Sequence, residues 1–460
     1  MAIEKPEPFP GPAGRPRGRR NPCSGARLVV ALFLPLLGAC DLMSPSASGS
    51  AVAIPDPQLK AAIREQLEIP SGPIVPMRLQ RLKTLHAGRR EISNLAGLEY
   101  ASELETLDLH LNDVSDLSPL SGLSELEQLH LSGNDIHDVS PLRGLTRLES
   151  LALHGNRITD LSALGDLTGL VVLEIGHNQV SDLSPLSGMA NLERLGLSGN
   201  PISELSGLNT LSLESLNIAG SGISDLEGLA GLDDLQSLRA HENLISDLEP
   251  LSDFERLETL SLQGNEISDL SPLVGLTNLW SLQLHDNDVA DLSPLRELTS
   301  LERLSLDGNR ISDLTPLSGL AIEWLHLEDN RITNLAGLDE LERLFELWLD
   351  GNQLSDLTPL GDAVSLRRLR LSENEISDLS PLSELTELIV LELDDNRISD
   401  ITGLVENEGL RAKPLLPPQD VTVALRGNPL GAEALCEDVP LLEERGVAVL
   451  VDGSCPESEG

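Results

Sequence analysis

Histidine is the residue type in this sequence whose spacing first suggests chemistry. Eight of the nine histidines fall shortly before one recurring position of a repeated pattern, and the first five occupy five successive repeats. Imidazoles along one face can bind a soft divalent metal or respond to acid pH. The alternative is that repeat duplication copied a histidine onto a solvated face; we adopt this interpretation and expect no metal or other cofactor. The eight are His86, His110, His130, His154, His177, His241, His285 and His326, of which His110, His130 and His154 are the weak metal candidates.

Tryptophan and arginine form a second group, in a chain that is only 2% aromatic. Trp324 lies six residues before Asn330, and Trp348 lies four residues before Asn352. These positions fall on the outward side of a short strand, so both indoles are expected to leave the core. Trp280 and Phe345 lie two positions further back. In the alternative interpretation these two side chains are partly packed and the remaining aromatic and basic residues are surface without a binding role.

Strand register then places the neighbours of these tryptophans. His326 is expected beside Trp348, with Arg370 on the other side. Exposed Trp and Arg surrounded by acidic residues have the composition of a protein-interaction hot spot. The alternative is a surface without a binding role. The predicted partner-binding residues are Trp324, His326, Trp348, Arg368, Arg370 and Asp350, with Asp307 and Glu328 beside Asp350 in the adjacent column.

The net charge of the chain narrows the classes of function that the protein can have. The chain has 460 residues with 74 Asp and Glu against 32 Lys and Arg, a formal net charge of −42. Such a surface repels nucleic acid and anionic lipid headgroups and favours a partner with a basic or mixed-charge surface. The sequence contains no Gly-rich phosphate loop, no His-Glu-x-x-His and no Cys/His zinc spacing. We therefore expect a binding protein and not an enzyme.

The N-terminus has the features of an export signal. Residues 28–37 (LVVALFLPLL) form an apolar run too short to span a bilayer. The run leads into Leu37-Gly38-Ala39-Cys40, which resembles the lipobox of bacterial lipoproteins. The resemblance implies that Cys40 becomes the lipidated first residue of the mature chain. An ordinary signal peptide with a chance cysteine is the alternative.

Two further cysteines lie near the C-terminus. Cys436 and Cys455 flank the final segment of the chain. An even pair in an exported protein is typical of a disulfide, which we predict here; two free thiols are the alternative.

A repeat of 22 residues positions all these side chains. The frame around each recurring asparagine is Leu-x-x-Leu-x-Leu-x-x-Asn-x-Ile, as in residues 301–311. Its x-Leu-x-Leu-x part alternates, which predicts a short strand with leucine inward and variable residues outward. The asparagine is expected to turn inward and satisfy backbone groups at the bend. The second half reads Ser-Asp-Leu-Ser-Pro-Leu, which predicts a short turn or 3₁₀ segment with the Asp capping nearby backbone amides.

This frame is identified as the leucine-rich repeat, in about sixteen turns over residues 83–430. Its Pro-containing half resembles the internalin-type repeat and also that of a eukaryotic phosphatase-regulatory subunit. The resemblance implies a leucine-rich repeat solenoid (horseshoe) with a parallel β-sheet on the concave face, short turns or 3₁₀ segments on the convex face and a helical N-terminal cap. Asp56-Pro57 is expected to begin that cap.

The expected organisation follows from these patterns. It comprises a signal peptide and lipobox (1–40), a tether (41–53), an N-terminal cap (54–82), leucine-rich repeats (83–410), and a last repeat with a disulfide-stapled C-terminal cap (411–460).

The expected function is that of a lipid-anchored, extracytoplasmic module in the cell envelope that binds a protein through its concave face. Carbohydrate or cell-wall binding is one alternative, and a purely structural envelope protein is another.

Overall fold

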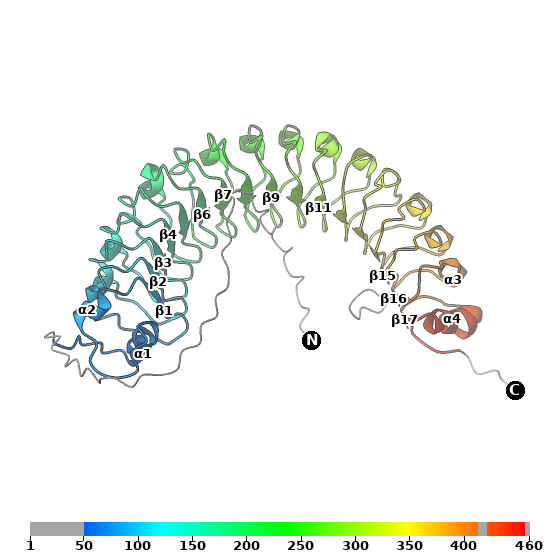
Figure 1. Cartoon of the computed structure of the whole chain (residues 1–460). Coiled ribbons are helices and arrows are strands. Elements are labelled where there is room, and N and C mark those ends of the chain that lie inside the picture. The colour runs from blue at the N-terminus through cyan, green and yellow to red at the C-terminus, as the bar shows by residue number, and fades with distance from the viewer. Residues whose placement is uncertain (1–49, 413–420, 456–460) are drawn as a thin grey trace, which may run out of the picture. The chain divides into compact units, whose positions relative to one another are not determined.

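The computed structural model describes residues 50–412 and 421–455 of the chain (Figure 1). The expected signal peptide, the lipobox at Cys40 and most of the tether lie outside these residues. Within them, residues from 50 onward form a curved solenoid whose strands line the concave side (Figure 1).

Seventeen strands of the described chain form one parallel sheet, in which each strand pairs with the next along the sequence. The strands are short because each repeat devotes only its x-Leu-x-Leu-x part to the sheet. Their bounds are β1 Thr84–His86, β2 Thr106–Asp108, β3 Gln128–His130, β4 Ser150–Ala152, β5 Val172–Glu174, β6 Arg194–Gly196, β7 Ser215–Asn217, β8 Ser237–Arg239, β9 Thr259–Ser261, β10 Ser281–Gln283, β11 Arg303–Ser305, β12 Trp324–His326, β13 Glu346–Trp348, β14 Arg368–Arg370, β15 Val390–Glu392, β16 Val421–Ala424 and β17 Val447–Leu450.

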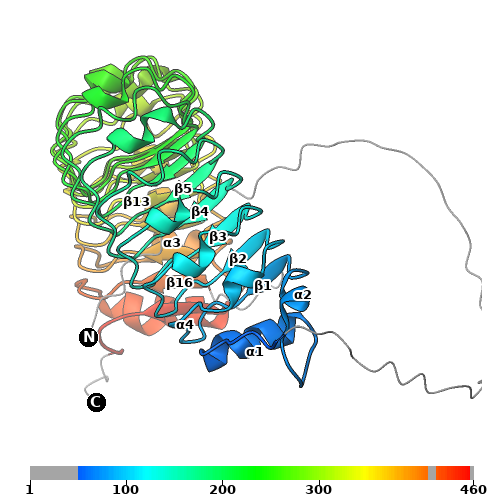
Figure 2. The same cartoon turned by 90° about the vertical axis from the view of Figure 1, so that its left-hand side faces the viewer.

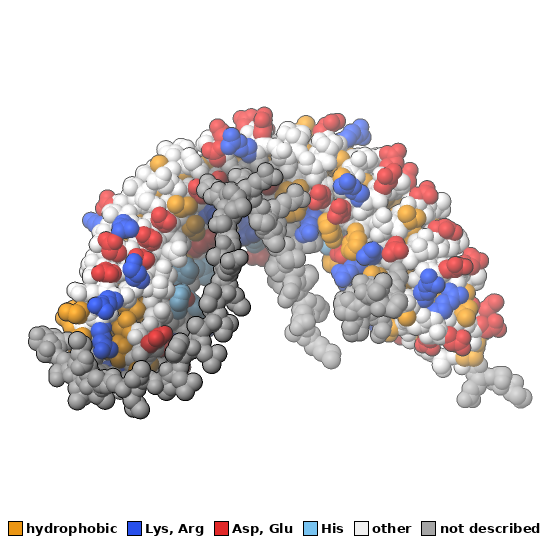
Figure 3. Space-filling view, viewed as in Figure 1, with side chains coloured by type: hydrophobic (Ala, Val, Ile, Leu, Met, Phe, Trp, Pro, Cys, Tyr) orange, Lys and Arg blue, Asp and Glu red, His pale blue; other side chains and the backbone are white. Residues whose placement is uncertain are grey.

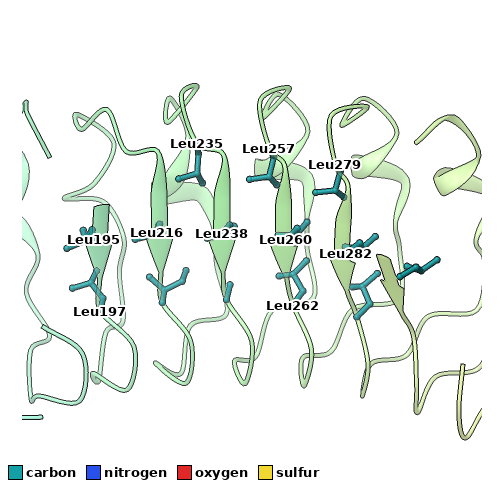
Figure 4. Packing of buried hydrophobic residues seen from close by; sticks show 14 of the residues in the cluster. Leu195, Leu197, Leu216, Leu235, Leu238, Leu257, Leu260, Leu262, Leu279 and Leu282 are labelled. Carbon is teal, nitrogen blue, oxygen red and sulfur yellow. The ribbon is translucent and has the colours of Figure 1, made fainter. Parts of the chain in front are cut away.

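Leucine columns form the core behind this sheet. The central leucines of successive strands are in register, as where Leu238 pairs with Leu216 on one side and Leu260 on the other (Figure 4). All three are buried. A solenoid this thin has space for one layer of aliphatic side chains, which accounts for the scarcity of aromatic residues.

An asparagine ladder supports the bend after most of the strands, as the sequence predicts. Asn156 Nδ2 donates to the carbonyl oxygens of Leu131 and Leu153 at 3.0 and 2.8 Å. Its Oδ1 accepts from the backbone N–H of Ile136 at 3.0 Å. Each such side chain therefore joins two adjacent repeats.

The convex side is built from single 3₁₀ turns. In η2, Pro119 occupies the first turn, and Asp116 Oδ1 accepts from Ser118 N at 2.8 Å. This contact holds the pKa of Asp116 below its usual value. The bounds of these turns are η1 Leu98–Tyr100, η2 Ser118–Leu120, η3 Ser140–Leu142, η4 Ser184–Gly188, η5 Glu227–Leu229, η6 Glu249–Leu251, η7 Ser271–Leu273, η8 Ser293–Glu297, η9 Thr315–Leu317, η10 Thr358–Leu360 and η11 Ser380–Leu382.

The N-terminal end is covered by α1 (Pro57–Gln66) and α2 (Pro76–Leu79). Figure 2 shows α1 at the end of the solenoid, next to β1. Asp56 caps α1 by accepting from the backbone N–H groups of Gln58 and Leu59, and its other oxygen accepts from Ser93. One carboxylate thus joins the cap to the first repeat.

The C-terminal end contains α3 (Thr402–Glu406), the π-helical turn η12 (Ala434–Asp438) and α4 (Val439–Glu444). Cys436 and Cys455 form the expected disulfide, which closes a loop around α4 and β17. No helix in the described ranges is long and apolar enough to cross a bilayer.

Candidate functional site

The candidate site lies on the concave face of strands β10–β14. The first and third residues of each strand point away from the leucine core, and the second is buried among the leucines. Because the strands are in register, outward residues of successive repeats form columns. Hydrophobic side chains lie beside Lys and Arg on the inner rim of the C-terminal half (Figure 3).

One column places Trp348 between His326 and Arg370, as the repeat register predicts. The His326 and Trp348 rings are stacked, with centroids 3.7 Å apart and planes 4° from parallel. The Arg370 guanidinium lies 4.4 Å from the centroid of Trp348. Both faces of this indole are therefore covered, and what remains open is its edge. We call His326, Trp348 and Arg370 the middle ladder.

A second row runs along the edge of the sheet. Arg303 lies between two indoles, with its guanidinium 4.2 Å from the Trp324 centroid and 5.7 Å from that of Trp280. Trp324 then contacts Phe345 at a centroid distance of 6.1 Å. Arg367 lies 5.4 Å from the Phe345 ring and ends the row. We call these five residues the edge ladder; alternating rings and guanidiniums support one another by cation–π attraction.

Glu346 lies between the two ladders and is buried. Its Oε1 is 3.1 Å from His326 Nε2, and its Oε2 accepts from Arg368 Nη1 at 3.4 Å. Burial raises the pKa of this carboxyl, but the hydrogen bond from His326 and the charges of His326 and Arg368 outweigh that effect and hold the pKa below its usual value.

Carboxylates fill the neighbouring column, as expected. Burial raises the pKa of Asp307 to about 6. Burial and a hydrogen bond shared with Glu328 raise the pKa of Asp350 above its usual value. Arg370 pairs with Glu328 at 3.5 Å and with Glu392 at 3.4 Å. The site is thus mixed in charge, with acids outnumbering the guanidiniums.

Five of the six predicted partner-binding residues lie on the adjacent strands β12–β14, and Asp350 lies just after β13, but the six are not equally open. Trp324 and Trp348 are partly exposed, whereas His326 is only 4% exposed because Trp348 and Glu346 cover it. Arg368 and Arg370 are engaged in ion pairs. His326 therefore holds the exposed side chains in place and contributes little exposed surface of its own.

Sequence reasoning missed Arg303 and Glu346. Both are direct register neighbours of Trp324, Arg303 on one side and Glu346 on the other. The repeat spacing could have identified Arg303, because Arg303 precedes Trp324 by one repeat of 21 residues.

The first five of the eight repeat histidines belong to the N-terminal half, where Figure 3 shows pale-blue side chains on the concave side. His110 Nδ1 lies 2.7 Å from Asp108 Oδ1, and the rings of His154 and His177 meet edge-on with centroids 4.8 Å apart. His177 is set apart from the rest by its left-handed backbone, with φ at 51°. Across the described part of the chain, no three His, Cys, Asp or Glu side chains converge as metal ligands.

Comparisons with known proteins agree with this architecture. The family described as "Leucine Rich repeats (2 copies)" matches residues 102–144, 124–166, 277–319 and 364–406, and the family described as "Leucine rich repeat" matches residues 146–202. No curated protein gives a significant match.

Solved structures give further matches. An internalin (inlF) from Listeria monocytogenes is 31% identical with a TM-score of 0.65; the match covers 76% of this chain and 96% of that one. A leucine-rich repeat protein from Leptospira interrogans has a TM-score of 0.72 at 22% identity, covering 82% and 97%. The plant peptide hormone receptor RGFR1, in complex with RGF2, has a TM-score of 0.55 at 21% identity, covering 78% and 70%. The chain therefore belongs to the leucine-rich repeat proteins and, among them, to the internalin-like family.

Proposed function

We propose that this protein is an extracytoplasmic recognition module that binds a protein partner through the concave face of β10–β14 and is held to a membrane by lipid on Cys40. The observation that carries the proposal is the pair of ladders. They place three partly exposed indoles and three arginines on, or directly before, neighbouring strands. Tryptophan and arginine are the residue types most enriched where binding energy concentrates in protein interfaces.

Charge indicates the kind of partner. The ladders are bordered by Asp307, Glu328, Asp350 and Glu392, in a chain of net charge −42. A partner that presents basic or mixed charge would be attracted over long range and paired at contact. The plant receptor solved in complex with RGF2 shows that a solenoid of this fold can hold a polypeptide ligand.

Ring geometry weighs against carbohydrate as the ligand. Stacking on a sugar needs an open aromatic face, and both faces of Trp348 are covered by His326 and Arg370. Trp324 has Arg303 over its ring. The exposed indole edges and guanidinium groups can contact the varied hydrogen-bond donors and acceptors of a protein surface. They offer no open aromatic face on which a sugar ring could stack.

The test is partner capture with the purified protein as bait, followed by titration of the purified partner. The matched variants are Trp324→Ala/Trp348→Ala in the ladders and Gln128→Ala/His130→Ala at the equivalent positions of β3. Removing two hot-spot tryptophans should weaken binding at least about 30-fold, which is roughly 2 kcal/mol. The β3 variant should bind like wild type.

Two outcomes would count against the proposal. A partner that binds both variants equally would move the site away from the ladders. No partner, with no binding of glycans either, would favour a purely structural role in the envelope.

The anchor has its own test. Cys40→Ala should move the protein from the membrane fraction to the soluble fraction, since lipid on Cys40 is the proposed attachment. Unchanged fractionation would refute the lipobox interpretation and leave the binding proposal standing.

A further inference from the structure

Glu346 is unusual on the concave face because it is a carboxylate held almost out of contact with water. Its side chain is 8% exposed, whereas the Arg368 side chain that pairs with it is 46% exposed. A buried charge is costly unless partners satisfy it. Here both oxygens are engaged, one with His326 and one with Arg368.

The His326 side chain depends on this carboxylate for its orientation. An ionised carboxylate only accepts hydrogen bonds, so the Nε2 atom of His326 must carry the proton that points at Oε1. A ring held at one nitrogen by a partner 3.1 Å away keeps its plane fixed. That plane lies flat against Trp348, at 4°.

We infer that Glu346 is a positioning residue for the binding face: by holding His326 flat against Trp348, it fixes the indole edge-on toward the partner. The partner itself rests on the function proposed above, but the positioning can be measured without one. Preorganised aromatic side chains bind more tightly because less rotamer freedom is lost on association.

Fluorescence of Trp348 gives a direct readout. The chain has three tryptophans, so Trp280→Phe/Trp324→Phe leaves Trp348 as the single emitter. In this background, Glu346→Ala should raise the acrylamide quenching constant of Trp348, because without the carboxylate the His326 ring is no longer held flat against the indole. Glu346→Gln should be quenched like wild type, since its amide oxygen can still accept the hydrogen bond from His326 Nε2.

Glu387→Ala is the matched control. Glu387 is another carboxylate paired with an arginine of the same face, at 3.7 Å from Arg367, but it is exposed and pairs with the end of the edge ladder instead of the middle ladder. It should leave the quenching of Trp348 unchanged, and circular dichroism should show all variants folded. Quenching in Glu346→Ala equal to that of wild type, or equal increases in Glu346→Ala and Glu387→Ala, would overturn the inference.

The two proposals fail separately. Increased quenching of Trp348 in Glu346→Ala, in a protein that captures no partner, would refute the binding function alone. Partner binding lost on Trp324→Ala/Trp348→Ala, with no effect of Glu346→Ala on the quenching of Trp348, would refute the positioning role alone.

Discussion

Replacement of one ladder asparagine should show how strongly adjacent repeats depend on it. Asn156 is 8% exposed and lies in the middle of an unbroken run of such residues. In Asn156→Ala the backbone N–H of Ile136 loses its acceptor. The carbonyl oxygens of Leu131 and Leu153 each lose one of two amide donors, because Asn134 and Asn178 still donate to them.

The magnitude follows from counting these groups. A buried polar group left without a partner costs about 1–3 kcal/mol. One N–H group left without a partner, together with two lost hydrogen bonds to carbonyls that keep a second donor, gives a loss of about 2 kcal/mol in the free energy of unfolding. Asn156→Ser should cost less, because the chain already carries serine at this position in Ser221, whose Oγ lies 3.3 Å from the Ala219 oxygen.

Urea unfolding followed by far-UV circular dichroism measures the effect, with the slope checked for constant cooperativity. Asn191→Ala is the control: this exposed asparagine donates one hydrogen bond to the Thr168 oxygen at 2.9 Å, outside the ladder. Loss of this hydrogen bond should lower the free energy of unfolding by well under half as much as Asn156→Ala does. Equal losses for Asn156→Ala and Asn191→Ala would refute the view that the ladder holds the turns.

The remaining predictions concern the C-terminal cap and the acidic column. Replacing Cys436 and Cys455 together by serine should lower the free energy of unfolding by about 3 kcal/mol, since the loop they close is 19 residues in sequence separation; a urea midpoint unchanged by reductant would contradict this. The raised pKa of Asp307, about 6, means that the folded state binds the proton more tightly than the unfolded state. Its contribution to stability is therefore lost as pH rises from about 4 to 6, and Asp307→Asn should gain stability relative to wild type at pH 7 but not at pH 4. Parallel pH profiles of the two proteins would contradict it.

The fold was predictable because the repeat frame leaves few alternatives. Leu301, Leu304 and Leu306 can be buried together only if residues 301–306 are extended, and Asn309 can reach two repeats only from the following bend. The same frame also gave the column that holds Trp348, because register carries each outward residue onto its neighbour.

The side-chain arrangement within the columns was not predictable in the same way. Whether His326 stands open or lies under Trp348 depends on rotamers chosen by contacts between residues about 20 positions apart. In the sequence Glu346 is one of 74 acidic residues, and only its burial against His326 in the structure distinguishes it from the others. The repeat frame specifies the backbone position of each side chain but not its rotamer.

Hydrogen bonds between repeats run along the axis of the solenoid, both in the sheet and in the asparagine ladder, and this has a mechanical consequence. A pulling force applied between the two ends would load these bonds one interface at a time. Each rupture would release one repeat of 22 residues, so the chain would lengthen in nearly equal steps of about 70 Å. The residues between Cys436 and Cys455 would not extend, because the disulfide carries the load across them.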